Sequence, residues 1–276
     1  TFRIGGKAEA VVIVNNIEEL QFVLKTLEQE NLLWCVLGKG SNVLIDDAGF
    51  PGAVLKLAGE FAQIEMISEQ EVIVGAGATL TAFVTWCSEH GLSGAEFLYG
   101  IPGTIGGATL MNAGAWEKEI SDILTVVEVV SADNEIKIGK DELGFGYRSC
   151  ENWSSFEGDY VVSSVKLSLE KDDVTLIKER CKKLIKKRQE KQPVGSGNCG
   201  SVFKNPPGIS AGKLIDECGL KCTCVGDAMV SQEHANFIIN RGKATAKEVK
   251  ELMQLVQRKV KQEKGIDLIP EVKFIP

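Results

Sequence analysis

The feature that most constrains this chain is a glycine-rich segment at residues 195–206, with the sequence GSGNCGSVFKNP. Three of its first six residues are glycine, and glycine loses more backbone freedom on folding than any other residue. A merely structural turn avoids that entropic cost, so we expect a ligand or another piece of backbone to approach closely here. The segment therefore predicts a ligand-binding loop, with Ser201 as its candidate reactive side chain.

Ser201 has three possible roles: nucleophile, contact to a phosphate, or proton donor. A serine nucleophile needs an adjacent base, which is usually histidine. The chain contains only two histidines, His90 and His234. A proton donor needs no such base, so the scarcity of histidine disfavours the nucleophile.

Composition indicates an ordinary globular protein of one to three domains, since 44% of the 276 residues are hydrophobic and 25% are charged. The net charge of −7 argues against nucleic acid as a partner, because such binding depends on clustered Lys and Arg. No run of eighteen apolar residues and no secretory signal pattern occur, so we expect no membrane association and a cytoplasmic location. The first residue is threonine, from which we expect that an upstream segment is missing.

The eight cysteines do not predict a metal centre or a disulfide framework. Cys218, Cys222 and Cys224 have a spacing that matches none of the common zinc sites, so we expect reduced thiols and no metal. A basic run at residues 182–188 suits an amphipathic helix with a solvated face, and contact with an anionic ligand is the alternative.

Periodicity predicts helices and strands mixed in each of three parts of the chain, residues 1–58, 59–170 and 171–276. Cap signatures support two helices, with Asn16 and Glu19 at one start and Thr245 and Glu248 at another. The expected helices span residues 17–28, 79–90, 174–190, 211–218 and 245–264. The expected strands span residues 9–14, 33–37, 71–74, 126–130, 160–169, 236–240 and 270–275.

Two further glycine loops suggest where phosphates bind. The first, residues 38–42, follows a strand but lacks the third glycine and the helix of a dinucleotide fingerprint, and it lacks the ending of a P-loop. The second, residues 100–107, contains four glycines and one proline. Each alone is more typical of a structural turn. Two nests of backbone N–H groups in neighbouring parts of the chain suit a diphosphate.

Five separated motifs together resemble the family of UDP-N-acetylenolpyruvoylglucosamine reductases: residues 37–44, 100–107, 147–149, 200–206 and 270–272. The resemblance spans the whole chain. It implies an α+β fold with two FAD-binding subdomains of the vanillyl-alcohol oxidase type, at residues 1–58 and 59–170. It also implies a C-terminal α+β substrate-binding domain at residues 171–276, whose final strand returns to the flavin. It also implies a monomer with NADPH as co-substrate. The residues that it places on FAD are Gly38, Lys39, Gly40, Ser41, Asn42, Ile101, Pro102, Gly103, Thr104, Gly106 and Gly107.

The resemblance further implies a reaction, the reduction of UDP-N-acetylglucosamine enolpyruvate to UDP-N-acetylmuramate. Negative charge then develops beside the substrate carboxylate, where Arg148 and Glu271 would stabilise it. Ser201 would protonate the carbanionic carbon, since an enediolate is basic enough to accept a hydroxyl proton. Substrate contacts would come from Tyr147, Lys191, Lys204 and Asn205.

Taken alone, Arg148 is more typical of a surface salt bridge and Glu271 of an exposed strand carboxylate. Two positions also depart from the family pattern, Cys150 where a serine is common and Met229 where a glutamine is frequent. The short interval between Arg148 and Ser201 indicates the subtype that lacks a tyrosine-bearing insertion. The alternatives to the reductase are an FAD-dependent oxidase of the same fold and a nucleotide-binding module without catalytic activity.

Overall fold

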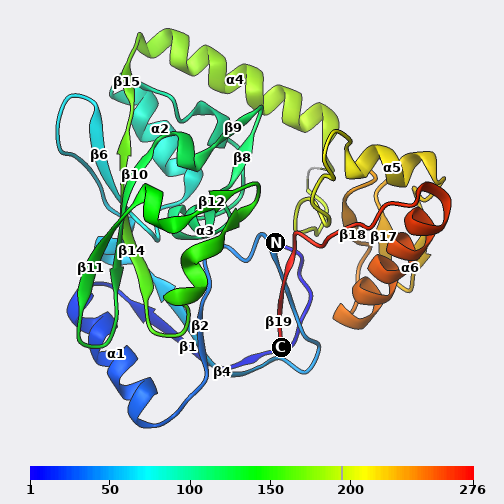
Figure 1. Cartoon of the computed structure of the whole chain (residues 1–276), viewed down its shortest axis with the longest axis horizontal. Coiled ribbons are helices and arrows are strands. Elements are labelled where there is room, and N and C mark those ends of the chain that lie inside the picture. The colour runs from blue at the N-terminus through cyan, green and yellow to red at the C-terminus, as the bar shows by residue number, and fades with distance from the viewer. Residues whose placement is uncertain (194) are drawn as a thin grey trace. The chain divides into compact units, whose positions relative to one another are not determined.

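The computed structural model describes residues 1–193 and 195–276 (Figure 1). These residues form two compact units, each assembled from separate stretches of the chain. Unit 1 contains Thr1–Glu9, Gly40–Pro51 and Arg188–Pro276, and unit 2 contains Ala10–Lys39 and Gly52–Lys187. The three domains that the sequence predicts do not coincide with these units, and their separate binding roles stay a prediction.

The core of unit 2 is a five-stranded antiparallel sheet with the order β11-β10-β14-β6-β5. Its middle strands β10 (Leu124–Val130), β14 (Val161–Ser168) and β6 (Glu71–Gly75) lie side by side in Figure 1. Val127 pairs with Val165, which pairs with Val74, and all three are fully buried. Branched side chains pack well on a pleated surface, so this row of valines stabilises the sheet. The outer strands are β11 (Glu135–Gly139) and β5 (Ile64–Met66).

Helices α2 (Leu80–Glu89) and α3 (Ile105–Leu110) complete this core, in which Leu80, Phe83 and Ile105 are buried. The Thr79 hydroxyl caps α2 by accepting a hydrogen bond from the amide of Ala82. A smaller sheet has the order β1-β4-β2, formed by β1 (Ala8–Val14), β4 (Phe50–Leu57) and β2 (Trp34–Val36). Helix α1 (Ile17–Gln29) contributes Leu20, Leu24 and Leu27 to a cluster with Leu55 of β4.

Unit 1 contains a three-stranded antiparallel sheet, formed by β16 (Cys224–Val225), β17 (Ala228–Val230) and β18 (Ile238–Asn240). Helices α5 (Ala211–Glu217) and α6 (Ala246–Lys264) share one core with it. The apolar face of α6 repeats at helical spacing, with Val249, Leu252, Val256 and Val260 buried. The C-terminal strand β19 (Lys273–Ile275) pairs in parallel with β3 (Val43–Ile45).

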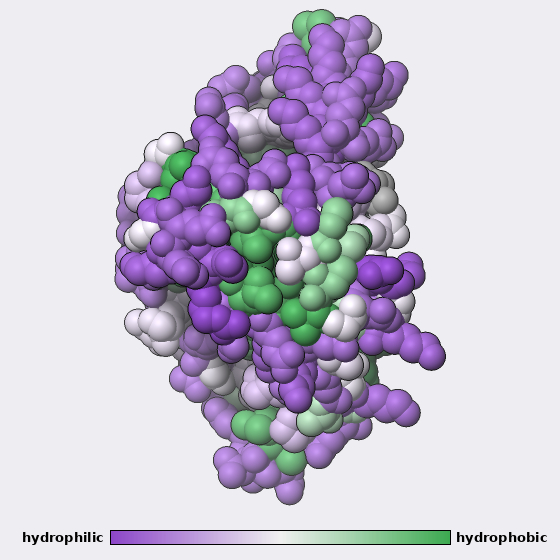
Figure 2. Space-filling view, turned by 90° about the vertical axis from the view of Figure 1, so that its right-hand side faces the viewer, coloured by the Kyte–Doolittle hydropathy of each residue, from purple (hydrophilic) through white to green (hydrophobic). Residues whose placement is uncertain are grey.

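Helix α4 (Val174–Lys191) is mostly exposed, and only Ile177 and Cys181 of its side chains are buried. Figure 2 shows one face of the molecule, hydrophilic over most of its area with one group of apolar side chains near its middle. Among the described residues, no helix is long and apolar enough to cross a membrane. The remaining short strands are β7 (Leu92–Ser93), β8 (Gly114–Ala115), β9 (Lys118–Glu119), β12 (Phe145–Gly146), β13 (Ser149–Cys150) and β15 (Glu170–Lys171).

The α+β class and the five predicted helices are confirmed, with helix ends within one residue of those expected. Both predicted caps are present, since Asn16 accepts from the amide of Glu19, and Thr245 forms a capping box with Glu248. The sequence analysis did not predict α3, which begins inside the second glycine loop. Four predicted strands are shorter than expected, since regular pairing is limited to Trp34–Val36, Val161–Ser168, Ile238–Asn240 and Lys273–Ile275.

Candidate active site

The first and second glycine loops meet at a pocket of unit 2 with a volume of about 590 Å³. Gly38 and Lys39 line it from the first loop, and Thr104, Gly106 and Gly107 line it from the second. A Cβ atom on residue 38 would lie 2.4 Å from the hydroxyl oxygen of Thr104. Glycine is therefore required at position 38 for the two loops to come so close. The structure thus brings five of the predicted cofactor residues to one pocket.

Part of the backbone in the second loop is already used by the fold. The amide of Ile105 donates to the carbonyl of Ala78 at 2.9 Å, and the amide of Gly106 donates to that of Ala76 at 2.9 Å. These two N–H groups cannot also contribute to an anion nest. The carbonyl of Gly103 accepts from the amide of Leu80. The predicted nest is therefore limited to other backbone groups of the two loops, and the second loop is anchored firmly to β6 and α2.

Two lysines bring positive charge to this pocket, Lys39 and Lys56. Lys56 lies near the end of β4, and its ammonium group donates to the carbonyl of Gly38. Burial lowers the pKa of Lys56, and the neighbouring charge of Lys39 lowers it further. The sequence analysis missed Lys56, although a lysine inside the apolar strand segment AVLKL is the signal that reveals it.

The other walls of the pocket are apolar and aromatic, and include Leu33, Val36, Trp34, Trp153 and Tyr160. Leu33 is 61% exposed and Val36 39% exposed. Exposed apolar side chains beside two lysines and two close-set loops suit a ligand that joins an anionic diphosphate to flat aromatic rings. FAD has this chemistry, so the residues present fit that cofactor.

Arg148 occupies a two-residue turn between β12 and β13, together with Tyr147. Its φ of 54° is in the left-handed region, which costs a non-glycine residue about 1–2 kcal/mol and persists only where the surrounding structure holds it. The guanidinium donates to the carbonyl of Gly114 at 2.6 Å and to that of Asn112 at 3.3 Å. It also lies 3.7 Å from a carboxylate oxygen of Glu119, and the Arg148 side chain is only 18% exposed. This setting is not that of a surface salt bridge.

Ser201 and Glu271 come together in unit 1, although they lie far apart in the sequence. The amide of Glu271 donates to the carbonyl of Val202, the residue after Ser201, at 2.8 Å. The carbonyl of Glu271 accepts from the side-chain amide of Asn42 at 3.2 Å, and Lys273 donates to the carbonyl of Asn42. The C-terminal segment therefore connects two of the three predicted catalytic residues with the end of the first glycine loop.

The predicted substrate residues differ in how they are held. The side-chain oxygen of Asn205 accepts a hydrogen bond from the amide of Ala211 at 3.0 Å, so this side chain helps to start α5. Lys204 is half-buried, and its amide donates to the carbonyl of Ile269. Lys191 is exposed at the last turn of α4. The ring of Tyr147 lies 5.2 Å from the guanidinium carbon of Arg148.

The thiols around the predicted site are neutral structural groups. Burial raises the pKa of the Cys150 thiol to about 11 and that of Cys199 to about 12, and the Cys150 sulfur donates to the carbonyl of Leu143. A thiolate nucleophile therefore does not form at either position near neutral pH. Within the described part of the chain, no group of three or more His, Cys, Asp or Glu side chains is placed to hold a metal.

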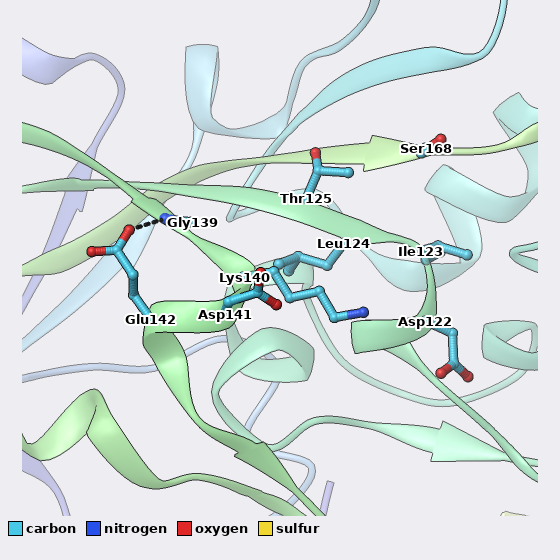
Figure 3. Close-up of a pocket in the computed structure, with 9 residues that line it drawn as sticks. All are labelled: Asp122, Ile123, Leu124, Thr125, Gly139, Lys140, Asp141, Glu142 and Ser168. Carbon is cyan, nitrogen blue, oxygen red and sulfur yellow. Dashed lines mark hydrogen bonds between the residues drawn. The ribbon is translucent and has the colours of Figure 1, made fainter.

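A second hollow in unit 2, of about 560 Å³, has a mixed lining in which two of the carboxylates accept local backbone hydrogen bonds (Figure 3). Glu142 accepts a hydrogen bond from the amide of Gly139 at 2.8 Å, drawn as a dashed line. Asp122 accepts from the amide of Glu119 at 2.8 Å. These two carboxylates cap turns of the chain, and Lys140 and Asp141 are the other charged residues of the lining.

Comparison with known proteins identifies the domains and the family of this chain. The model of the FAD binding domain matches residues 8–139, and that of the UDP-N-acetylenolpyruvoylglucosamine reductase C-terminal domain matches residues 192–275. The reductase of that name from Chlamydia abortus is 41% identical and the one from Caldanaerobacter subterraneus 38%, each over 100% of this chain and about nine-tenths of its own length. The crystal structure of the Thermus caldophilus reductase has a TM-score of 0.82 at 40% identity, covering 96% of this chain and 92% of that one.

Fold, pocket and matched domains define an FAD-containing oxidoreductase of the α+β class. Because full-length relatives share about 40% of the sequence, the family can be named as well. The chain belongs to the family of UDP-N-acetylenolpyruvoylglucosamine reductases, which use FAD and NADPH to reduce a UDP-sugar substrate for peptidoglycan synthesis.

Proposed function

We propose that this chain reduces UDP-N-acetylglucosamine enolpyruvate with Ser201 as the proton donor and with Arg148 and Glu271 as the groups that stabilise developing charge. The single observation that supports this most is the hydrogen bond from the amide of Glu271 to the carbonyl of Val202. It pairs the backbone of Glu271 with the residue after Ser201, so that these two proposed catalytic residues lie on neighbouring segments of unit 1.

FAD, when bound, supplies the hydride that NADPH delivers, and that hydride adds to the methylene carbon of the enolpyruvyl group. The C=C bond opens, and the electron pair moves to the neighbouring carbon and its carboxylate. The Arg148 guanidinium matches a carboxylate by its planar set of donors and stabilises that charge. Glu271 in its protonated form donates a second hydrogen bond to the same group.

Ser201 then transfers its hydroxyl proton to the carbanionic carbon, which yields the lactyl ether, and solvent returns a proton to the serine oxygen. An enediolate is strongly basic, so a hydroxyl held in place is an adequate acid. Cofactor binding falls to Gly38, Lys39, Gly40, Ser41, Asn42, Ile101, Pro102, Gly103, Thr104, Gly106 and Gly107, to which we add Lys56. Substrate binding falls to Tyr147, Lys191, Lys204 and Asn205. We further propose that the protein is cytoplasmic and monomeric. Light scattering of the purified protein tests the monomer.

The two half-reactions of Ser201→Ala test this proposal. With FAD bound and oxygen excluded, NADPH is expected to bleach the flavin of the variant at the normal rate, since no step before hydride transfer to the substrate uses the hydroxyl. Reoxidation by the enolpyruvyl substrate is expected to slow by about a hundredfold or more, the usual effect of losing a general acid. Stopped-flow absorbance at the flavin band measures both rates.

Ser196→Ala is the matched control, because Ser196 lies in the same glycine-rich loop and donates to the carbonyl of Pro193. It is expected to leave both rates close to normal. Equal loss of both half-reactions in Ser201→Ala would refute the proton-donor role. A flavin that the enolpyruvyl substrate cannot reoxidise in the unaltered protein would refute the assigned substrate.

A further inference from the structure

One buried amide side chain holds the backbone next to Ser201. Asn236 is 3% exposed and lies in unit 1, just before β18. Its side-chain nitrogen donates to the carbonyl of Phe203 at 2.8 Å, and its side-chain oxygen accepts from the amide of Phe203 at 3.0 Å. One side chain therefore satisfies both polar groups of one backbone residue, as a partner strand would do.

The main chain around Asn236 continues this pairing. The amide of Val202 donates to the carbonyl of Asn236 at 2.9 Å, and Ser201 forms a bridge with Phe237. On its other edge, the segment after Ser201 pairs through the carbonyl of Val202 with Glu271. Residues 201–203 are thus held from both sides, by the segment at Asn236 and by the C-terminal segment.

Asn236 is itself held in place by a neighbour. The backbone N–H of Asn236 donates to the Nδ1 atom of His234 at 3.2 Å. This hydrogen bond requires His234 Nδ1 to carry no proton. Phe203 is also fully enclosed, with 2% of its surface exposed. A buried N–H and C=O without partners is costly, so loss of the Asn236 side chain would leave two polar groups of Phe203 without these hydrogen bonds.

We propose that Asn236 is a positioning residue, which fixes the Ser201 hydroxyl for proton transfer by holding both polar groups of Phe203. The proposal rests on the proposed role of Ser201. Gly200, directly before the serine, has a φ of 81°, so the chain turns sharply there and the hydroxyl depends on the segment that follows for its direction. Proton transfer is sensitive to such direction, because a displacement of about 1 Å can reduce the rate about a hundredfold.

Asn236→Asp is the first variant to test, because it keeps the shape and the acceptor of the side chain but loses the donor to the Phe203 carbonyl. In the FAD-bound enzyme, NADPH is expected to reduce the flavin at the normal rate. Reoxidation by the enolpyruvyl substrate is expected to slow by about tenfold to a hundredfold, mainly in kcat. Its solvent deuterium isotope effect is expected to rise, because proton donation then limits the rate.

Asn240→Asp is the matched control, since the Asn240 side chain also donates to backbone carbonyls of unit 1, those of Phe2 and Arg3. It is expected to change neither half-reaction by more than about twofold. Asn236→Ser, smaller and neutral, provides a second variant if the aspartate does not fold. A double-mutant cycle with Ser201→Ala completes the test. If Asn236 acts through Ser201, the double variant is expected to lose less rate than the product of the fold-losses in the two single variants.

Four results decide the matter. Slower reoxidation with normal reduction and a non-additive cycle supports the proposal. Normal reoxidation in both Asn236 variants overturns it while leaving the role of Ser201 intact. Equal slowing of both half-reactions, or an additive cycle, also overturns it, because Asn236 then serves only general stability. Normal reoxidation in Ser201→Ala is a separate outcome, which refutes the proposed function itself.

Discussion

At the scale of single residues, the partners of a side chain decide what it can do. Arg148 illustrates this, since two backbone carbonyls and a carboxylate hold its guanidinium in a left-handed turn. Its own motif, a tyrosine, an arginine and a serine, is short enough to occur anywhere. Sequence alone favoured a surface salt bridge for it, and only the folded chain reveals the carbonyls of Asn112 and Gly114 beside it.

His234 leads to a prediction on pH. Burial lowers its pKa below the ordinary value of 6.5, and the charge of Lys221 lowers it further. The unfolded chain therefore binds a proton at a higher pH than the folded chain does, so the free energy of unfolding is expected to fall as the pH drops below about 6.5. Urea unfolding between about pH 5 and pH 8 measures this dependence.

The variant His234→Asn separates this effect from the titration of other groups. Its side-chain oxygen can accept the hydrogen bond from the amide of Asn236 in place of Nδ1, and it does not titrate. We expect a flatter pH dependence than in the unaltered protein. His90→Asn, at an exposed histidine, is the control and is expected to retain the original slope. An unchanged slope in His234→Asn would contradict the prediction.

At the scale of elements, helix caps that lie beside their helix in the sequence were predicted, and a cap supplied from a distant part of the chain was not. The capping box at Thr245 and Glu248 and the left-handed Gly265 mark both ends of α6 within the helix's own sequence. Asp47 caps the same helix from a position 199 residues away, by accepting from the amide of Ala246 at 2.7 Å. Helix α3 escaped prediction because it has only six residues, two of them glycine.

The distant cap gives a prediction on stability. Asp47 also accepts from the amide of Lys247 at 2.9 Å, so Asp47→Ala leaves two amides of the first turn without these partners. We expect the free energy of unfolding to fall by about 1 kcal/mol, the usual cost of losing a helix cap. Urea midpoints measure the change. Asp133→Ala removes a carboxylate that is 71% exposed and pairs with Lys25, and a change near zero is expected there. Equal effects of the two substitutions would exclude a capping role for Asp47.

At the scale of the whole molecule, the five motifs identified the family, but the path of the chain could not be read from them. The first glycine loop is divided between the two units, with Gly38 and Lys39 in unit 2 and Gly40, Ser41 and Asn42 in unit 1. The part in unit 1 leads directly into β3, and the parallel pairing of β3 with β19 joins residues far apart in the sequence, a contact that no local pattern encodes. The chain thus passes from unit 2 to unit 1 after Lys39, and the domain boundary expected at residue 58 stays a prediction.

The same organisation gives a prediction on kinetics. Beyond the two glycine loops proposed for FAD, the sequence contains no further candidate dinucleotide-binding motif, so we expect NADPH and the enolpyruvyl substrate to use one site in turn. NADPH would react with the oxidised enzyme, and the enolpyruvyl substrate would react with the reduced enzyme that NADPH leaves. This order is a ping-pong mechanism. Initial rates measured against one substrate at several fixed concentrations of the other are expected to give parallel reciprocal lines. High concentrations of either substrate are expected to inhibit, since each then occupies the form of the enzyme meant for the other.

Lys204→Met provides the decisive comparison, because Lys204 is a proposed substrate contact and lies in unit 1. If the two substrates share the site, Lys204→Met is expected to raise the KM of the enolpyruvyl substrate. It is also expected to raise, by the same factor, the concentration at which this substrate inhibits the enzyme. Lys213→Met, at an exposed lysine of α5 whose partner is Glu217, is expected to change neither value. Intersecting reciprocal lines would show that both substrates bind together, and a separate site for NADPH would then have to exist.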